Sequence, residues 1–294
     1  MENSSKIPLT LTRDTGRLSL GQRIFYEKNG FILIPHLVPL DVLERCNQRF
    51  EDISSGKVPK GAMTVMRDIN DRKSVNKLQD FNTDEVLFEY VSHKDVVDVV
   101  ESFTGPNIMA MHTMLIAKPP DIGYGSSKHP PHQDLYYFPF RPADKIVASW
   151  TAMEPCDVKN GCLYVLPGSH KKFSLLPHEY PSESVNKMYH GIQKLEDAKG
   201  WINLEMQPGD TVFFHPLLIH GSGINQSKRT RKAISAHYAS ADCTYIEVEG
   251  TVQEKIKDEV MEVVKRRLPG VTNVKFDDIW RFKSALVRGI RSSL

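Results

Sequence analysis

Two patterns of apolar residues divide the chain. Up to residue 106, apolar side chains recur at spacings of three and four residues, which is typical of helices that bury one face. This spacing predicts a helix that begins near Leu20 and ends at Asn29. A second helix follows Pro39, a residue tolerated in a first turn, and a third covers 92–104. Between the first two helices, residues 31–35 predict a short buried strand.

From residue 107 onward the pattern is that of strands. Short runs of apolar, β-branched and aromatic residues alternate with Pro, Gly and Asn, which is typical of a β-sandwich or barrel. The predicted strands are 108–117, 131–138, 146–153, 162–166, 201–206, 211–215, 217–220 and 233–239. After residue 250 the helical spacing returns, over 252–268 and 277–290.

These patterns predict a single domain that is mainly β with flanking helices. We expect a flexible arm (1–17), a helical N-terminal part (18–106), a β core (107–245) and C-terminal helices (246–294). Residues 170–199 are polar and lack periodicity, so they indicate a long surface insertion of a length that can cover the mouth of a site.

Composition excludes several classes of protein. Hydrophobic residues make up 40% of the 294 residues and charged residues 25%, as in a globular chain that folds alone. The 38 basic residues nearly cancel the 36 acidic ones, so the net charge does not indicate that the protein binds nucleic acid or a membrane surface. No run of about 18 apolar residues is present and the first 30 residues are polar and charged, so we expect neither a membrane span nor secretion.

Cysteine usage and the chain end bear on the compartment. The four cysteines form no C-x-x-C pair, which argues against a disulfide scaffold or a zinc knuckle and fits a reducing compartment. They are Cys46, Cys156, Cys162 and Cys243. The last three residues, 292–294, read Ser-Ser-Leu and resemble the peroxisomal address Ser-Lys-Leu without its basic residue. A polar tail that ends in Leu is common by chance, so this tripeptide alone is weak evidence for a peroxisomal location, with the cytoplasm as the alternative.

Two His-x-Asp triplets are candidates for a metal site. Residues two apart share one face of a strand, whereas on a helix they point roughly 200° apart. The triplet that begins at His93 opens a predicted helix, where Ser92 and Asp95 suit a capping box. The triplet of His132 and Asp134 follows two prolines, which favour an extended backbone. We predict that His132 and Asp134 hold one metal ion.

The third metal ligand is predicted to be His220. It lies at the end of an apolar run on a distant strand, whereas His215 precedes a proline in the middle of that run. Singly, a histidine is more often a hydrogen-bonded structural residue, but two histidines and one carboxylate together suit Fe(II). They leave three octahedral positions open for a bidentate cosubstrate and O2. Zinc prefers a closed or four-coordinate site.

Arg231 is the predicted partner of this metal site. It lies eleven residues after His220 on the next predicted strand. A buried guanidinium needs a carboxylate, and its fork suits the far end of a dicarboxylic acid. Ser222, two residues after His220, can add a hydroxyl to the same carboxylate. Alternatively, Arg231 belongs to the solvated basic run 228–232.

With these residues the chain resembles the phytanoyl-CoA dioxygenase family of Fe(II)- and 2-oxoglutarate-dependent oxygenases. The likeness extends from about Gly30 to the C-terminus. It is most specific in three runs, which are FTGPNIMAMHTML (103–115), HQDL (132–135) and GDTVFFHPLLIHGSG (209–223). The resemblance implies a double-stranded β-helix, which is a jelly roll of the cupin type, with N- and C-terminal helices.

The resemblance also implies roles for single residues. The family's iron ligands fall on His132, Asp134 and His220. Its 2-oxoglutarate contacts fall on Lys77, Met114, Trp150, Ser222 and Arg231. Lys77, Met114 and Trp150 come from the resemblance alone, because their residue types in isolation indicate a surface charge and two core residues. Gln133 is expected to point to the opposite face of its strand.

The activity implied is 2-hydroxylation of phytanoyl-CoA and related 3-methyl-branched acyl-CoAs, the first step of fatty-acid α-oxidation in the peroxisome. Fe(2+), 2-oxoglutarate as cosubstrate and ascorbate as reductant are the expected cofactors. We expect basic residues at the site mouth for the anionic CoA, with candidates Lys118, Lys128, Lys171 and Lys172. Four aromatic residues are candidates for an acyl channel or, equally, for the core. They are Tyr136, Tyr137, Phe138 and Phe140.

Three other functions stay open at this point. The first is an oxygenase of the same fold with another small-molecule substrate, because sites are grafted on common folds. The second is a catalytically silent binding module, against which the intact triad and Arg231 argue. The third is a zinc hydrolase, disfavoured because the sequence fixes no general base beside the triad.

Overall fold

Two antiparallel sheets form the centre of the molecule. The computed structural model describes residues 9–68, 73–123, 125, 127–180, 189–193, 195, 198–267, 270 and 272–294. The larger sheet has the strand order β1-β10-β7-β12-β4-β3-β2, with β14 also paired to β4. Its strands are β1 (Phe31–Ile34), β2 (Thr64–Arg67), β3 (Val75–Gln79), β4 (Ile108–Lys118), β7 (Ile146–Ala152), β10 (Thr211–Phe214), β12 (Arg231–Ser240) and β14 (Ala285–Arg288).

The smaller sheet has the order β5-β11-β8-β9. Its strands are β5 (His129–His132), β8 (Leu163–Val165), β9 (Ile202–Leu204) and β11 (His220–Ser222), and a separate pair is formed by β6 (Phe140–Arg141) and β13 (Thr244–Tyr245). Trp150 and Phe214 of the larger sheet pack with Leu163 and Val165 of the smaller one in a single buried cluster. The two sheets therefore face each other, as the predicted sandwich requires.

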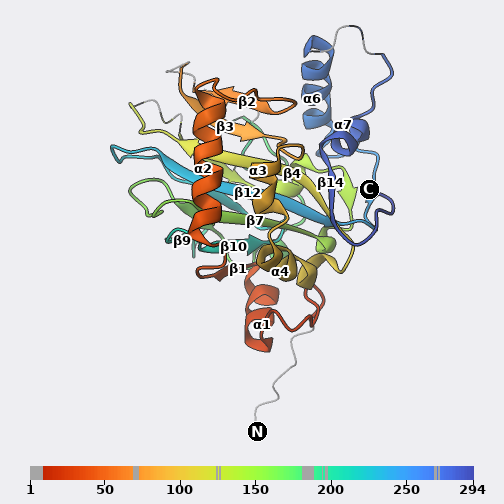
Figure 1. Cartoon of the computed structure of the whole chain (residues 1–294). Coiled ribbons are helices and arrows are strands. Elements are labelled where there is room, and N and C mark those ends of the chain that lie inside the picture. Colours follow the sequence, from red (N-terminus) through yellow and green to blue (C-terminus); the bar gives the residue numbers. More distant parts are fainter. Residues whose placement is uncertain are drawn as a thin grey trace.

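Helices flank the two sheets. They are α1 (Leu20–Asn29), α2 (Leu40–Ser54), α3 (Glu85–Val91), α4 (Lys94–Thr104), α5 (Ser169–Lys172), α6 (Glu254–Arg267) and α7 (Phe276–Lys283), with 3-10 turns η1 (Asp134–Tyr137) and η2 (Ala143–Lys145). In Figure 1, α2, α3 and α4 lie across the sheet, whereas α6 and α7 stand together at one end. None of the described helices is long and apolar enough to cross a bilayer.

The larger core lies between these helices and the sheet. Phe50 of α2, Leu87 of α3 and Phe103 of α4 share a buried cluster with Phe213 and Ile234 of the central strands. The apolar spacing that predicted α2 and α4 is therefore the stripe that faces the sheet. The prediction of α1 is also confirmed. This helix ends where the sequence places Gly30, which adopts φ 81 and so closes the helix in the left-handed conformation that glycine favours.

Several elements differ from the sequence predictions. The strand predicted over 131–138 is wrong beyond β5, because the chain turns into η1 at Asp134. The strand predicted over 217–220 is a turn, and His220 begins β11 rather than ending a strand. The helix predicted over 277–290 stops at Lys283 and continues as β14. Short elements with little periodicity, namely β2, β3 and α3, were missed.

The capping box predicted at Ser92 is also wrong. The N-cap of α4 is His93, whose side chain makes no capping bond. The Asp95 carboxylate instead accepts a hydrogen bond of 3.0 Å from Arg17 Nη2, a tertiary contact that local sequence does not reveal. Nevertheless, this His-x-Asp triplet lies at a helix start, away from the metal triad, as the sequence argument proposed.

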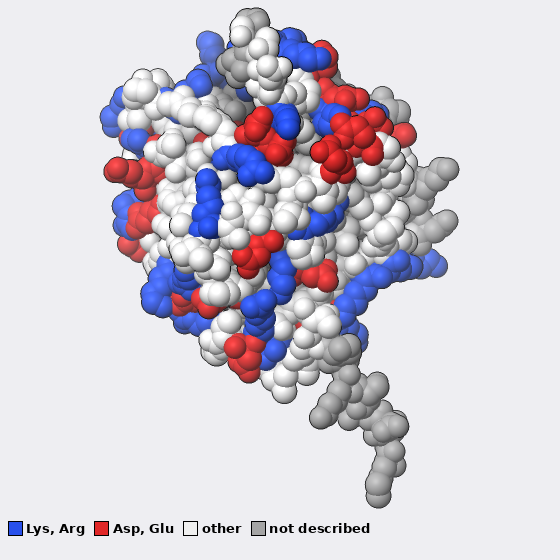
Figure 2. Space-filling model, turned by 90° about the vertical axis from the view of Figure 1, so that its right-hand side faces the viewer, with Lys and Arg blue, Asp and Glu red and all other residues white. Residues whose placement is uncertain are grey.

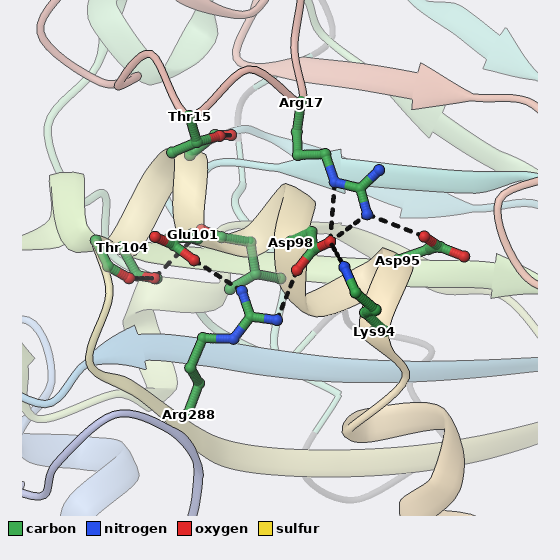
Figure 3. A network of polar contacts seen from close by, with 11 residues as sticks. Thr15, Arg17, Lys94, Asp95, Asp98, Glu101, Thr104 and Arg288 are labelled. Carbon is green, nitrogen blue, oxygen red and sulfur yellow. Dashed lines mark hydrogen bonds and ion pairs between the residues drawn. The ribbon is translucent and has the colours of Figure 1, made fainter.

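The N-terminal segment is bonded to α1 at Leu11 and to α4 from Arg13 onward, which corrects the expected flexible arm over 11–17; residues 1–8 lie outside the described residues. Figure 3 shows Asp98 of α4 at the centre of this contact. Its carboxylate accepts hydrogen bonds from Arg17, from Lys94 Nζ at 2.5 Å and from Arg288 Nη2 at 2.6 Å. Asp98 thus ties the N-terminal segment and β14 to one helix.

We predict that Asp98→Asn destabilises the fold at neutral pH by about 1 kcal/mol, a value for a partly solvated ion-pair network. Burial raises the pKa of Asp98, but hydrogen bonds from Lys94, Arg288 and Arg17 outweigh it and hold the pKa well below its usual range. A carboxyl whose pKa is depressed by folding contributes stability above its unfolded pKa of about 3.9 and loses it as pH falls further.

Urea unfolding of both proteins between pH 7 and pH 2 measures this difference. It should shrink as the pH falls below about 4, because the Asp98 carboxyl then takes up a proton in the unfolded wild-type chain, which favours unfolding, while it stays ionised in the folded protein. Asp95→Asn is the control, since Asp95 contacts only the outer side of Arg17 and its side chain is 46% exposed. A difference that stays constant down to pH 2 contradicts the role given to the Asp98 charge.

Candidate functional site

Three buried side chains from three elements meet between the two sheets. His132 ends β5, Asp134 begins η1 and His220 begins β11. His132 and His220 lie directly opposite each other across the antiparallel β5–β11 pair. One ligand atom of each residue lies within 4.8 Å of the others, and no other such group occurs within the part of the chain that the structure describes.

Backbone carbonyls orient both histidines for a metal ion. His132 Nδ1 donates to the Pro130 carbonyl at 2.9 Å, and His220 Nδ1 donates to the Leu218 carbonyl at 3.0 Å. Because a carbonyl only accepts, each Nδ1 carries the proton and each Nε2 is left with a lone pair. The two Nε2 atoms lie 3.3 Å and 3.6 Å from Asp134 Oδ1. This donor set fits a divalent cation with open coordination positions.

A further histidine holds the other oxygen of Asp134. His237 of β12 donates from Nε2 to Asp134 Oδ2 at 2.9 Å, so only Oδ1 faces the two ligand histidines. Burial raises the pKa of Asp134, but the neighbouring His220 and His237 outweigh it and hold the pKa well below its usual range. Burial lowers the pKa of His220 to about 4. At neutral pH the triad therefore offers a carboxylate and a neutral imidazole, the forms that bind metals.

A second polar cluster lies at the far end of the same space. Arg231 begins β12, is 2% exposed, and donates from Nη2 to the Gly161 carbonyl at 2.7 Å. Its guanidinium lies 5.3 Å from the centre of the Trp150 ring, and its Nε has no partner in the structure. A Cβ on Gly161 would lie 2.5 Å from the Gly223 carbonyl oxygen, so the loop that supports Arg231 requires glycine.

Ser222 also belongs to this cluster. It ends β11, two residues beyond His220, and its Oγ accepts a hydrogen bond of 2.7 Å from Lys118 Nζ. Lys118 is 6% exposed and lies opposite Arg231 in the β4–β12 register. Arg231 is therefore not part of a solvated basic run, although Lys228 and Arg229, which precede it, are exposed.

One cavity of about 360 Å³ joins the triad to this cluster. All eight site residues predicted from the sequence line it: His132, Asp134, His220, Arg231, Ser222, Lys77, Met114 and Trp150. Lys77 is 6% exposed, and its Nζ lies 4.7 Å from the centre of the Tyr189 ring. The surface location that its residue type indicated is thus wrong, whereas the contact with 2-oxoglutarate that the family resemblance implies stays a prediction.

The insertion after α5 reaches the cavity, as its length suggested. Tyr189 lines the cavity and stacks on His129 with ring centres 4.4 Å apart. His129 in turn stacks on the metal-facing His132 at 4.1 Å. Gln133 points away from the metal triad, as predicted, because its amide nitrogen donates to the carbonyls of Ser174 and Leu217.

The lysines expected at the cavity mouth lie elsewhere. Lys118 is buried in the cavity wall, and Lys128 lines a separate surface pocket beside Trp201. Lys171 faces Glu27 at 3.8 Å, and Lys172 lies over Phe173. Of the four aromatic candidates, Tyr137 and Phe138 line the cavity, whereas Tyr136 and Phe140 are fully buried and outside its lining.

Sequence reasoning missed residues that strand alternation places on the cavity wall. On β12, His237 and Ser235 lie on the same face as Arg231, two residues apart. On β4, alternate residues from His112 to Lys118 line the cavity together with Met114. The period of two was a usable signal once Arg231 and Met114 had been assigned. The apolar residues of α6 and α7 in the lining carried no such signal.

Comparisons with known proteins agree with this site. The family model described as phytanoyl-CoA dioxygenase (PhyH) matches residues 26–233. A human protein named "Phytanoyl-CoA dioxygenase, peroxisomal" is 52% identical over 293 residues, which cover 96% of this chain and 86% of the human one. A Caenorhabditis elegans protein named "Probable phytanoyl-CoA dioxygenase" is 53% identical over 305 residues, covering 96% and 97% of the two chains.

Solved structures share the fold at low identity. EctD from S. alaskensis with bound Fe matches with a TM-score of 0.63 and 15% identity, over 79% of this chain and 80% of that chain. The non-haem α-ketoglutarate-dependent epimerase SnoN matches with a TM-score of 0.61 and 18% identity, over 85% and 87%. This likeness confirms the predicted cupin-like, double-stranded β-helix and by itself says nothing of the substrate.

We predict that His237→Phe weakens binding of a divalent metal by about 10- to 100-fold, because Asp134 then loses the donor that holds Oδ2. Titration calorimetry with Co(II) measures the affinity, and circular dichroism checks the fold. His237→Gln should restore part of the affinity, since its amide can donate to the same oxygen. His36→Phe is the control, because the His36 side chain is 76% exposed. Equal affinities of His237→Phe and wild type would sink this positioning role.

Proposed function

The chain belongs to the phytanoyl-CoA dioxygenase (PhyH) family, and from this premise we propose that it catalyses Fe(II)- and 2-oxoglutarate-dependent 2-hydroxylation of phytanoyl-CoA and related 3-methyl-branched acyl-CoAs. The observation that carries the proposal is one cavity that joins the His-Asp-His triad to two buried basic residues, Arg231 and Lys118. None of the described carboxylates forms an ion pair with either of them. Relatives at 50–53% identity bear the name of this activity.

The triad suits Fe(II) as its resident metal. His132, Asp134 and His220 approach from one side, and the open side faces the cavity, where a bidentate cosubstrate and O2 need adjacent coordination positions. Bound Fe(II) with 2-oxoglutarate and O2 supplies the oxidising chemistry: 2-oxoglutarate becomes succinate and CO2, and one oxygen atom enters the C–H bond at C2 of the acyl chain. Ascorbate is the proposed reductant that keeps the iron ferrous.

The inner end of the cavity suits the distal carboxylate of 2-oxoglutarate. Arg231 presents an Nε–H that has no partner among the described residues, and Ser222, two residues beyond His220 on β11, lines the same cavity. Buried cations without an anion are costly, so a dicarboxylate bound here gains charge-assisted hydrogen bonds as well as metal coordination. Met114 and Trp150 line the space between these polar groups and exclude water from the cosubstrate.

The outer end of the cavity suits an acyl chain. Its lining includes Ile256, Val260 and Val263 of α6 and Ile279 and Trp280 of α7. These side chains, with Tyr137 and Phe138 beside the triad, form an apolar wall that faces the metal. A branched acyl chain lying along it would present one of its first carbons to the metal while the thioester and CoA remain outside.

The basic residues at this outer end are Arg267, the last residue of α6, and Lys283, the last residue of α7. Arg267 is exposed, and Lys283 lies 3.3 Å from Asp80. We assign them, in place of the four lysines favoured by the sequence, to the anionic CoA. The face shown in Figure 2 carries acidic and basic side chains side by side, so attraction of CoA depends on local groups and not on a uniformly basic surface.

The alternative functions differ in what they leave unexplained. A catalytically silent module needs neither the oriented Nε2 atoms nor the Arg231 cluster. A zinc hydrolase needs a carboxylate base beside the metal, and Asp134, the carboxylate found there, has one oxygen aimed at both histidines and the other bonded to His237. A same-fold oxygenase with another substrate keeps every feature of the site except the apolar wall from α6 and α7.

We predict that Fe(II)-loaded protein given 2-oxoglutarate, ascorbate, O2 and phytanoyl-CoA forms succinate and 2-hydroxyphytanoyl-CoA in equal amounts. Asp134→Ala should abolish both products, because it removes a ligand of the metal. Lys128→Ala, outside this cavity, should leave both rates unchanged. Succinate without hydroxylation would retain the oxygenase but reject this substrate, and no succinate from folded, iron-loaded protein would favour the silent module. Omission of ascorbate should shorten the period of turnover.

We propose a peroxisomal location, which the names of the human, rat and bovine relatives support. The C-terminal tripeptide remains the candidate signal, but the folded chain restrains it. Leu294 is 2% exposed, and the N–H groups of Ser293 and Leu294 donate to the Ala241 carbonyl. A receptor that reads the end of the chain must first detach these residues.

A fluorescent reporter that carries residues 285–294 tests the tripeptide free of its fold. We predict a punctate signal that coincides with a peroxisomal marker, and Leu294→Ala in the same reporter should make it diffuse. A diffuse signal from both reporters contradicts targeting by this tripeptide. The full chain with a reporter at its N-terminus tests the location independently of the tripeptide. A cytosolic signal from this full chain contradicts the peroxisomal proposal itself.

A further inference from the structure

We propose that Lys118 is a second binding cation for the distal carboxylate of 2-oxoglutarate, beside Arg231. The inference rests on the proposed function and adds a residue to that site. Neither the sequence patterns nor the family resemblance gave Lys118 this role; the sequence suggested it for the CoA end of the cavity. The geometry points instead to the end of the cavity that Arg231 and Ser222 line.

The position of Lys118 follows from strand pairing. It is the last residue of β4, and its partner across the β4–β12 ladder is Arg231, the first residue of β12. Because Met114 and Lys118 are four residues apart on one strand, they share a face, and both line the cavity. The last residue of β4 and the first residue of β12 are therefore both basic, and strand pairing brings them to the same wall of the cavity.

The contacts of Lys118 leave room for a ligand. Its Nζ donates to Ser222 Oγ at 2.7 Å and to the Gly223 carbonyl at 2.6 Å. An ammonium group has three N–H donors, so one remains without an acceptor. Since Ser222 Oγ accepts from Lys118, its own proton is directed elsewhere and can serve a carboxylate. Lys118, Ser222 and the Nε–H of Arg231 then offer three donors to a single anion.

Electrostatics make the free state of this cluster unfavourable. Lys118 and Arg231 are 6% and 2% exposed, and none of the described Asp and Glu residues forms an ion pair with either. Burial, with a smaller effect from Arg231, lowers the pKa of Lys118 well below its usual range, so its charged form is costly while no anion is bound. Two like charges removed from water need an anion between or beside them. A dicarboxylate that reaches this end of the cavity supplies it.

A structural role is the competing reading of the same contacts. Lys118 joins the end of β4 to the turn after β11 through Gly223, so its loss could shift Ser222 and Arg231 without any direct contact to the ligand. The two readings differ in one respect. A binding cation matters only for a ligand that has a distal carboxylate, whereas a structural residue matters for every 2-oxo acid that binds the metal.

The test compares two 2-oxo acids on the Fe(II)-loaded protein by anaerobic titration calorimetry. 2-Oxoglutarate has the distal carboxylate and pyruvate lacks it, while both can chelate iron through the keto oxygen and adjacent carboxylate. Lys118→Gln removes the charge and keeps an amide donor, and Lys118→Met removes both. Lys128→Gln is the matched control, because Lys128 lines a different pocket. Thermal unfolding verifies that each variant is folded.

We expect Lys118→Gln and Lys118→Met to weaken 2-oxoglutarate about 10- to 100-fold, as for loss of a hydrogen bond to a charged group, and to leave pyruvate within about twofold. Equal losses for both acids, or no loss for 2-oxoglutarate, overturn the proposal. If the two variants do not fold, wild type and Arg231→Met decide between the readings. A preference of wild type for 2-oxoglutarate over pyruvate that is no larger than the factor lost in Arg231→Met leaves nothing for Lys118 to contribute and overturns the proposal. Wild type that binds neither acid contradicts the proposed function itself and is a separate result.

Discussion

The antiparallel pairing of β11 with β5 is the interaction on which the rest of the site depends. It sets His220 directly opposite His132, although the two residues are 88 positions apart in the sequence. β11 also pairs with β8, so the strand that carries His220 and Ser222 is held on both sides. Because the register of a strand fixes which side chains share a face, a slip of one residue would turn both of these groups out of the cavity.

The larger sheet contributes the opposite wall and most of its charge. β12 lies between β7 and β4 at its centre, and its residues Arg231 and His237 reach the two ends of the site, one at the carboxylate cluster and one at Asp134. A central strand paired along its whole length is rigid, so the separation between these two ends is fixed by the strand itself. Buried charges are tolerated there because the surrounding core on both faces of the sheet holds the backbone in place.

The helices after residue 250 complete the cavity without taking part in either sheet. α6 and α7 supply apolar side chains to the outer wall, and Glu259 of α6 accepts hydrogen bonds from His190 and Tyr180 of the insertion. Two segments that are distant in the sequence, and that both have residues in the cavity wall, are therefore bonded to each other. Metal and cosubstrate binding therefore depends on the rigid sheets, and substrate contact depends on peripheral elements. Substitutions in peripheral elements can change the substrate without disturbing the core.

The amino-acid sequence by itself determined the fold class, most strands and helices, and the identity of the triad and Arg231, because alternation, proline positions and ligand chemistry are local properties. It misplaced the ends of elements where local preference loses to tertiary contacts, as at Asp134, where η1 replaces a strand, and at Lys283, where the chain turns back to pair with β4. It also could not assign Lys118, His237 or the lining from α6. Their roles arise only from register and packing between distant segments, which decide whether a charged side chain faces water or a buried anion site.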